Sequence, residues 1–264
     1  MPCAGETEPL DTLTDPKLEL EALPLFRALP ASSRAGLLRH SVLHEVAPGT
    51  VLFEQGEIPT FQHVVLVGSV HLLGRSSTRR EVLIEVVEPP DLVIPAAVVT
   101  GSPYLMRARV PESSRLLLIH ADAFRNTVVR ESLLAQEVIV SLAGQFRRLV
   151  RQIKNLKLRT ATERVGCYLL ALSKRQRTPH RAILPYGKSL IASELGITRE
   201  SFSRALSALQ TEGVTVQGST TVIRDAKHLA IVCGLDPLID GPEESPQMQK
   251  SRLPKKAQSR SSRG

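Results

Sequence analysis

The sequence predicts an α+β protein with an N-terminal antiparallel β domain of jelly-roll type, one long helix, and a small C-terminal domain of helices and a hairpin. Short β-rich runs separated by turn residues fill residues 25–121. The hydrophobic period then becomes helical over residues 122–157, and residues 158–239 hold short helical patterns followed by a hairpin pattern. Because a change of period marks a change of structural class, we expect two domains joined by a helix.

Composition places the chain among globular proteins. It has 264 residues, of which 42% are hydrophobic, and this share is enough for a sizeable core. No apolar run approaches the length of about 18 residues that a membrane-spanning helix needs. Residues 1–24 form an acidic N-terminal extension without the apolar segment of a secretory signal. We therefore expect a cytoplasmic protein with no membrane partner.

The cysteines exclude two kinds of metal site. Cys3, Cys167 and Cys233 are widely spaced, and no Cys-x-x-Cys pair occurs. A zinc ribbon or a cysteine-held iron–sulfur cluster needs more thiolate ligands at closer spacing. We expect reduced structural or free thiols, and redox sensing stays open for Cys3 alone.

The net charge of +8 is concentrated in two places. Residues 240–264 are predicted to be a disordered basic tail, which is either simply solvated or adds a weak, salt-sensitive attraction to nucleic acid. The second basic concentration, residues 147–164, lies inside a predicted helical region and is therefore more informative.

The predicted β domain spans residues 25–121. Its runs are separated by turn residues about every ten positions, which is typical of an antiparallel barrel or jelly roll. The runs are Val42–Val46, Val51–Phe53, 63–73 with a break at Gly68 and Ser69, 81–88, and 115–119.

One helix of about 35 residues is predicted within residues 122–157. Six apolar residues along it are separated alternately by three and four positions, as in the a/d seam of a coiled coil: Ile139, Leu142, Phe146, Leu149, Ile153 and Leu156. Because the flanks of this seam are polar and basic, we predict that it pairs with a second copy in a parallel homodimer. Packing of the seam against the β domain of the same chain is the alternative.

Residues 188–209 have the pattern of a helix-turn-helix. Ile191, Leu195 and Phe202 fall where two crossing helices bury side chains, Gly196 relieves the turn, and Thr198 is placed to cap the second helix. The alternating residues 214–223, with Gly218 in their centre, predict a two-stranded wing.

The second helix of this motif has two different faces. At about 100° per residue, one face is apolar and the other presents two guanidinium groups, a carboxylate and a hydroxyl. Arg can bridge guanine O6 and N7, and Glu can accept from cytosine, so this face is suited to reading bases in a major groove. The predicted base-reading residues are Arg199, Glu200, Ser203 and Arg204, and the predicted phosphate contacts are Lys188, Ser189, Thr198 and Ser201. An ordinary solvated helix face is the alternative.

The chain resembles the Crp/Fnr family of bacterial transcription regulators over roughly residues 25–235. The resemblance rests on the stretches 47–57, 67–70 and 199–204. It implies a cyclic-nucleotide-binding-like sensor domain, a dimerisation helix and a winged helix that binds double-stranded DNA, with RNA polymerase as a further partner. Family members read bases with the residues that match Glu200 and Arg204, which implies a half-site with a TGA core.

Two departures from the family concern its ligands. Members that bind cyclic AMP have Gly-Glu and Arg-Ser pairs where this sequence has Ile94-Pro95 and Tyr104-Leu105. Without that arginine a cyclic phosphate loses a bidentate partner, so cyclic AMP is not the expected effector. The iron–sulfur branch needs clustered N-terminal cysteines, and only Cys3 is present.

The remaining effector pocket is predicted to be apolar. Its candidate lining residues are Leu92, Ile94, Val98, Tyr104, Leu105 and Met106. Some family members without the other sites bind haem and respond to a gas, and His63 and His71 are the candidate iron ligands here. An apolar or aromatic acid, or no effector at all, fits the sequence equally well.

The sequence predicts no enzyme, because it has no GxSxG, HExxH, P-loop or Gly-rich dinucleotide motif. Three interpretations remain open. The first is a DNA-binding regulator with an unknown effector, the second is a haem-based gas sensor, and the third is a module whose winged helix contacts protein rather than DNA.

Overall fold

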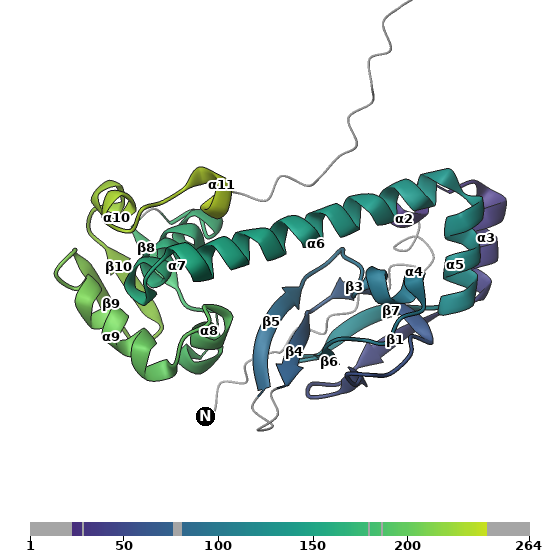
Figure 1. Cartoon of the computed structure of the whole chain (residues 1–264), viewed down its shortest axis with the longest axis horizontal. Helices are drawn as coiled ribbons and strands as arrows, with labels where there is room; N and C mark the ends of the chain where they lie inside the picture. Colours follow the sequence, from purple (N-terminus) through teal and green to yellow (C-terminus); the bar gives the residue numbers. More distant parts are fainter. Residues whose placement is uncertain (1–22, 28, 76–80, 179, 186, 242–264) are drawn as a thin grey trace, which may run out of the picture.

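The computed structural model describes residues 23–27, 29–75, 81–178, 180–185 and 187–241. A β domain lies along one long helix, α6 (Ser132–Leu158), and a C-terminal helical domain lies at the C-terminal end of this helix (Figure 1). This confirms the predicted α+β fold class. Cys3, most of the acidic extension and most of the basic tail lie outside the described residues. Within the described part, no helix is long and apolar enough to cross a membrane.

Two antiparallel sheets form the β domain, with strand orders β1-β7-β3 and β2-β6-β4-β5. Each predicted β-rich run is a strand or, for residues 63–73, two strands separated at Gly68, whose φ is 81°. Only β6 was not expected. The bounds are β1 Ser41–Val46, β2 Val51–Phe53, β3 Phe61–Val67, β4 Val70–Arg75, β5 Glu81–Val87, β6 Arg107–Arg109 and β7 Ser114–His120.

Short helices cover the β domain. Two of them, α2 (Pro24–Arg27) and α3 (Ala31–Arg39), precede the first strand, and α4 (Pro95–Thr100) interrupts the chain between β5 and β6. None of the three was expected. Ile94, the residue before α4, has a left-handed backbone with φ 43°. This conformation redirects the chain at the point where the effector pocket was predicted.

The prediction of one helix over residues 122–157 is wrong in one respect, because the chain breaks at Glu131. Its φ of −109° and ψ of 101° are extended, and they separate α5 (Ala121–Arg130) from α6. Ser33 Oγ lies 2.5 Å from Glu131 Oε1 and holds the break against α3. The two helices can therefore run in different directions, so that α5 buries Phe124 in the β-domain core while α6 leaves toward the other domain (Figure 1).

One polar flank of α6 is bonded to the β domain and is not simply solvated. Arg148 is central to this contact, because its guanidinium bridges the carboxylate of Glu85, in β5, and that of Asp91, which follows β5. The contacts are Ser141 Oγ with Asp91 Oδ1 (2.9 Å), Gln145 Nε2 with the Leu92 carbonyl (2.9 Å), Arg148 Nε with Glu85 (2.8 Å), Arg148 Nη2 with Asp91 (2.9 Å), and Gln152 Nε2 with the Ile84 carbonyl (3.1 Å). They fix the long helix along the domain.

The C-terminal domain packs helices on a small antiparallel sheet of order β8-β10-β9. The predicted hairpin is present as β9 and β10, and the third strand, β8, was not expected. A capping box between Thr160 and Glu163 begins α7. The bounds are α7 Ala161–Arg175, β8 Arg181–Ile183, α8 Lys188–Glu194, α9 Arg199–Leu209, β9 Val214–Gln217, β10 Thr220–Ile223, α10 Ala226–Val232 and α11 Pro237–Asp240.

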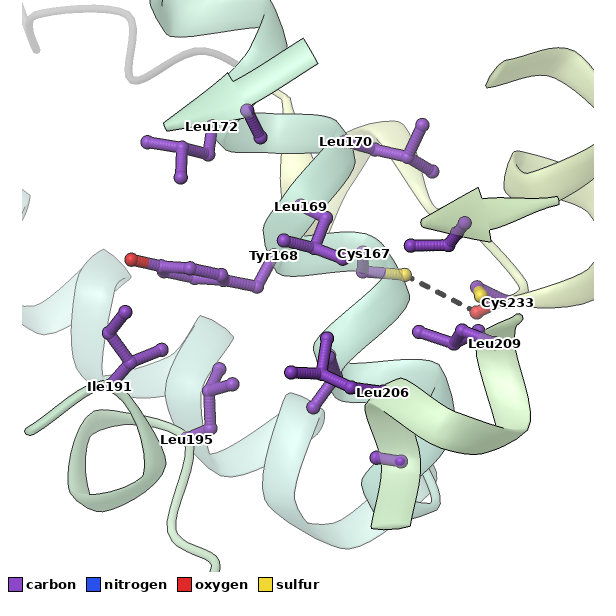
Figure 2. Packing of buried hydrophobic residues seen from close by; sticks show 14 of the residues in the cluster. Cys167, Tyr168, Leu169, Leu170, Leu172, Ile191, Leu195, Leu206, Leu209 and Cys233 are labelled. Carbon is purple, nitrogen blue, oxygen red and sulfur yellow. Dashed lines mark hydrogen bonds between the residues drawn. The ribbon is translucent and has the colours of Figure 1, made fainter. Parts of the chain in front are cut away.

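Helix α7 forms the centre of this domain's core. Figure 2 shows Tyr168 and Leu169 of α7 facing apolar side chains of α8 and α9, such as Ile191 and Leu206. The Cys167 thiol donates to the Cys233 carbonyl at 3.3 Å. Burial raises the pKa of Cys167 to about 12 and that of Cys233 to about 11, so both stay protonated and unreactive at neutral pH.

Candidate nucleic-acid interface and sensor-domain cavity

The turn between α8 and α9 depends on Gly196. Its φ is 64°, a left-handed conformation that favours glycine. A Cβ atom there would also lie 2.5 Å from Leu156 Cδ2, at the end of α6. Thr198 then caps α9, because its hydroxyl accepts a hydrogen bond from the Ser201 amide at 3.1 Å. The turn therefore fixes α9 relative to both α8 and the long helix.

Helix α9 separates apolar and charged residues on opposite faces. Phe202 and Leu209 are fully buried against α7, and Ala205 and Leu206 are nearly so. The four predicted base-reading residues are all exposed: Arg199, Glu200, Ser203 and Arg204. None of them is held inside its own domain, so this face is free to meet a ligand.

The carboxyl group of Glu200 on this face is ionised at neutral pH. Hydrogen bonds from its own backbone and from Thr198, and then Arg199 and Arg204, lower the pKa of Glu200, which is therefore ionised. Arg204 Nη2 lies 3.4 Å from Ser201 Oγ, and that hydroxyl lies 3.1 Å from Thr198 Oγ1. This network orders the first turn of α9 while leaving the guanidinium end of Arg204 exposed.

The four predicted phosphate contacts lie around the starts of the two helices. Lys188 begins α8 and is half-buried, Ser189 is exposed, and Thr198 and Ser201 lie in the cap of α9. The wing follows, with the pairs Gln217–Thr220 and Val216–Thr221 joined through Gly218 at φ 62°.

A contact that the sequence did not reveal joins α8 to the β domain. Ser193 Oγ accepts a hydrogen bond from the Leu83 amide, at the free edge of β5, at 3.0 Å. Burial raises the pKa of the adjacent Glu194, with Arg175 opposing and Glu88 adding to this effect. Pairing between residues 110 positions apart leaves no local pattern, so no sequence signal could have shown it.

The predicted dimer seam lies along one side of α6. Phe146 is 66% exposed, Ile139 54% and Ile153 52%, and Leu149 is also exposed. Leu156 is 41% exposed as well, but it and Leu142 also contact other parts of the chain. Leu142 packs partly against the β-domain core, and Leu156 also contacts the turn at Gly196. An apolar stripe thus remains uncovered within a single chain.

The predicted effector pocket is not a shared cavity in this structure. Leu105 is 81% exposed, whereas Leu92 and Val98 are buried in the core beside α5 and α6. Ile94 and Met106 pack partly against the other β-domain cluster. The left-handed turn at Ile94 and helix α4 send these side chains in different directions. An alignment to the family positions without gaps does not include this turn and helix. Of the six, only Tyr104 lines the cavity between β1, β2 and β3.

That cavity has a volume of about 310 Å³ and lies between β1, β2, β3 and Tyr104. His63 lines it, but His71, on β4, does not. No Lys or Arg lines the cavity to pair with haem propionates. The two histidines therefore do not fit a haem site.

Comparison with known proteins agrees with this architecture. The family described as cyclic nucleotide-binding domain matches residues 43–131, and the Crp-like helix-turn-helix domain matches residues 163–231. A CRP-like cAMP-activated global transcriptional regulator from Mycobacterium tuberculosis is 23% identical over an alignment that covers 78% of this chain and 94% of its own length. These matches cover the β domain, and the helices and wing, described above.

Two solved structures show the same fold. FixK2 from Bradyrhizobium japonicum has a TM-score of 0.61 and 22% identity, covering 72% of this chain and 96% of that chain. The c-di-GMP-responsive global regulator CLP from Xanthomonas campestris has a TM-score of 0.63 and 21% identity, covering 74% and 100%. Both matched domains are present in the expected order, and the chain belongs to the Crp/Fnr family of transcriptional regulators.

Proposed function

We propose that this protein is a sequence-specific DNA-binding regulator that binds a palindromic site as a homodimer. The proposal rests mainly on the two faces of α9. One face buries Phe202 in the domain core, and the other exposes Arg199, Glu200 and Arg204 to solvent. A guanidinium can pair with guanine and a carboxylate with cytosine in the major groove. The half-site core that we expect, TGA, comes from the family resemblance, as does RNA polymerase as a partner.

The exposed stripe on α6 supports the homodimer. Apolar residues that repeat at heptad spacing on a 27-residue helix are typical of coiled-coil pairing. The β domain covers the flank of α6 that holds Arg148 and Gln145, and it leaves the seam side open to a second copy. Two α9 helices about 34 Å apart would enter successive major grooves of one duplex face.

The β domain supports an effector other than cyclic AMP or an iron–sulfur cluster. Ile94-Pro95 and Tyr104-Leu105 offer no cation for a cyclic phosphate. The nearby Arg148 is already paired with Glu85 and Asp91 at 2.8 and 2.9 Å. A cyclic phosphate would have to displace both carboxylates from Arg148 before it could pair with the guanidinium.

The proposal is tested by fluorescence anisotropy at several salt concentrations, with a duplex of two inverted TGA half-sites and a scrambled duplex. Arg204→Ala should weaken binding to the TGA duplex by about 1–3 kcal/mol and so reduce the preference for it over the scrambled duplex. Lys188→Ala should weaken both equally and reduce the salt slope by about one. Arg39→Ala, an exposed arginine on α3, is the control and should change neither. Equal weakening of both duplexes by Arg204→Ala would contradict base reading.

A further inference from the structure

The cavity between β1, β2 and β3 has a closed floor and an open rim. Its floor is formed by four buried side chains, Val46, Phe53, His63 and Tyr104. Its rim carries exposed side chains, among them Glu57 and Thr60. The volume of about 310 Å³ is at the lower end of the range of small-molecule sites. The cavity therefore has the size for a molecule of one or two rings.

The floor is aromatic and rigid. The rings of Phe53 and Tyr104 stack with their centroids 3.6 Å apart and an interplanar angle of 12°, and His63 lies at 5.7 Å from Phe53. The backbone of Tyr104 is bonded on both sides to the loop between β2 and β3, through the Glu57 carbonyl (2.9 Å) and the Gly56 amide (2.8 Å). Flat apolar surfaces that are already held in place favour a planar ligand.

His63 is a polar group in this floor without a partner. It is only 6% exposed, and Nδ1 is buried with no hydrogen bond. Within the described part of the chain the imidazole has a ring contact with Phe53, and its Nδ1 has no hydrogen bond. A buried polar group without a partner is costly, and such a group in a cavity wall is placed to bind a ligand.

The charges around the cavity disfavour anions. No Lys or Arg lines it, and the Glu57 carboxylate lies on its rim. The same carboxylate adds to burial in raising the pKa of Tyr104 to about 12, so the phenol of the floor stays neutral. An anionic ligand would lose water without gaining a cationic partner.

We propose that this cavity binds a small, planar, uncharged molecule whose hydroxyl or ring N–H group hydrogen-bonds to His63. The site is distinct from the pocket predicted from the family positions, since Tyr104 is the one residue that they share. The inference deepens the effector part of the proposed function and rests on it for its regulatory meaning. Binding itself is measured without DNA, so a failure of either proposal is seen separately.

The test is isothermal titration of the full chain with indole and phenol as neutral probes and benzoate as the anionic comparison. Four proteins are compared: the unmodified chain, His63→Leu, Thr60→Trp on the exposed rim, and Thr211→Trp, an exposed threonine in the other domain, as the matched control. Thr60→Trp keeps the test decisive if His63→Leu fails to fold.

We expect indole or phenol to bind one per chain and benzoate roughly tenfold more weakly or worse. His63→Leu and Thr60→Trp should each weaken the neutral probe by roughly tenfold or more, and Thr211→Trp should leave it unchanged. Absence of binding by both neutral probes would overturn the proposal. So would equal affinity for benzoate, or equal affinity in the unmodified chain and the Thr60→Trp variant.

Discussion

Gly166 and Gly36 both lie inside helices, and an alanine at each position is expected to have opposite effects on stability. A Cβ atom at Gly166 in α7 would lie 2.1 Å from Cys233 Sγ and 3.2 Å from Cys233 Cβ, inside the core of Figure 2. At Gly36 in α3 the nearest atom would be Arg39 Nη2, at 3.8 Å. Alanine gains about 1 kcal/mol over glycine in a helix interior, whereas overpacking a core costs about 1–3 kcal/mol.

The buried position of Cys233 leaves its sulfur no room to move, so the overpacking cost at Gly166 is at the upper end of that range. We therefore expect Gly166→Ala to destabilise by about 2 kcal/mol and Gly36→Ala to stabilise by about 1 kcal/mol. Urea unfolding followed by circular dichroism measures both. Adding Cys233→Ala should relieve the clash, with a coupling of about 1–2 kcal/mol. The same sign for both glycines, or no coupling, would refute the packing argument.

Three further predictions follow from single contacts. Burial lowers the pKa of His63 from 6.5 to about 4. As the pH falls, the imidazole is therefore protonated in the unfolded chain before it is protonated in the folded one. The free energy of unfolding should fall by up to about 3 kcal/mol between pH 6.5 and 4. Urea midpoints across this range should fall less for His63→Gln, and an equal fall would contradict the assignment. Arg159 and Asp240 form a two-point ion pair at 2.7 and 2.6 Å with side chains only 6% and 10% exposed, so Asp240→Asn should cost about 3 kcal/mol in urea unfolding. Lys154→Gln, which removes a half-exposed pair with Asp236, should cost less than about 1 kcal/mol, and equal costs would show that burial is irrelevant here. Phe146→Glu places a charge in the exposed seam and should shift sedimentation from dimer to monomer, whereas an unchanged mass would exclude the seam as the interface.

The parts of the fold that the sequence predicted are those with local signals. Gly196 and Thr198 mark the turn and the cap of α9, and Gly218 marks the hairpin, because each residue type has a backbone or capping preference of its own. The two faces of α9 follow from helical spacing alone. The same is true of the strands bounded by turn residues.

The parts that it did not predict depend on contacts between distant residues. Strand β6 has only three residues, including Arg107 and Arg109, and it exists because it pairs between β2 and β4. The break at Glu131 lies within continuous helical periodicity and is held by Ser33, 98 positions away. The cavity was missed because its wall combines β1, β2, β3 and Tyr104, and no local pattern marks His63 as the buried group without a partner.

The most direct test of the account is selection of bound duplexes from a random-sequence pool by the full chain. If α9 reads bases from a two-fold assembly, the selected sites will share a two-fold symmetric motif with half-site centres one helical turn apart, about 34 Å. The Arg204→Ala variant will lose preference at one base pair in each half-site. Selected sites with no common motif, or an asymmetric motif that Arg204→Ala leaves unchanged, would contradict it.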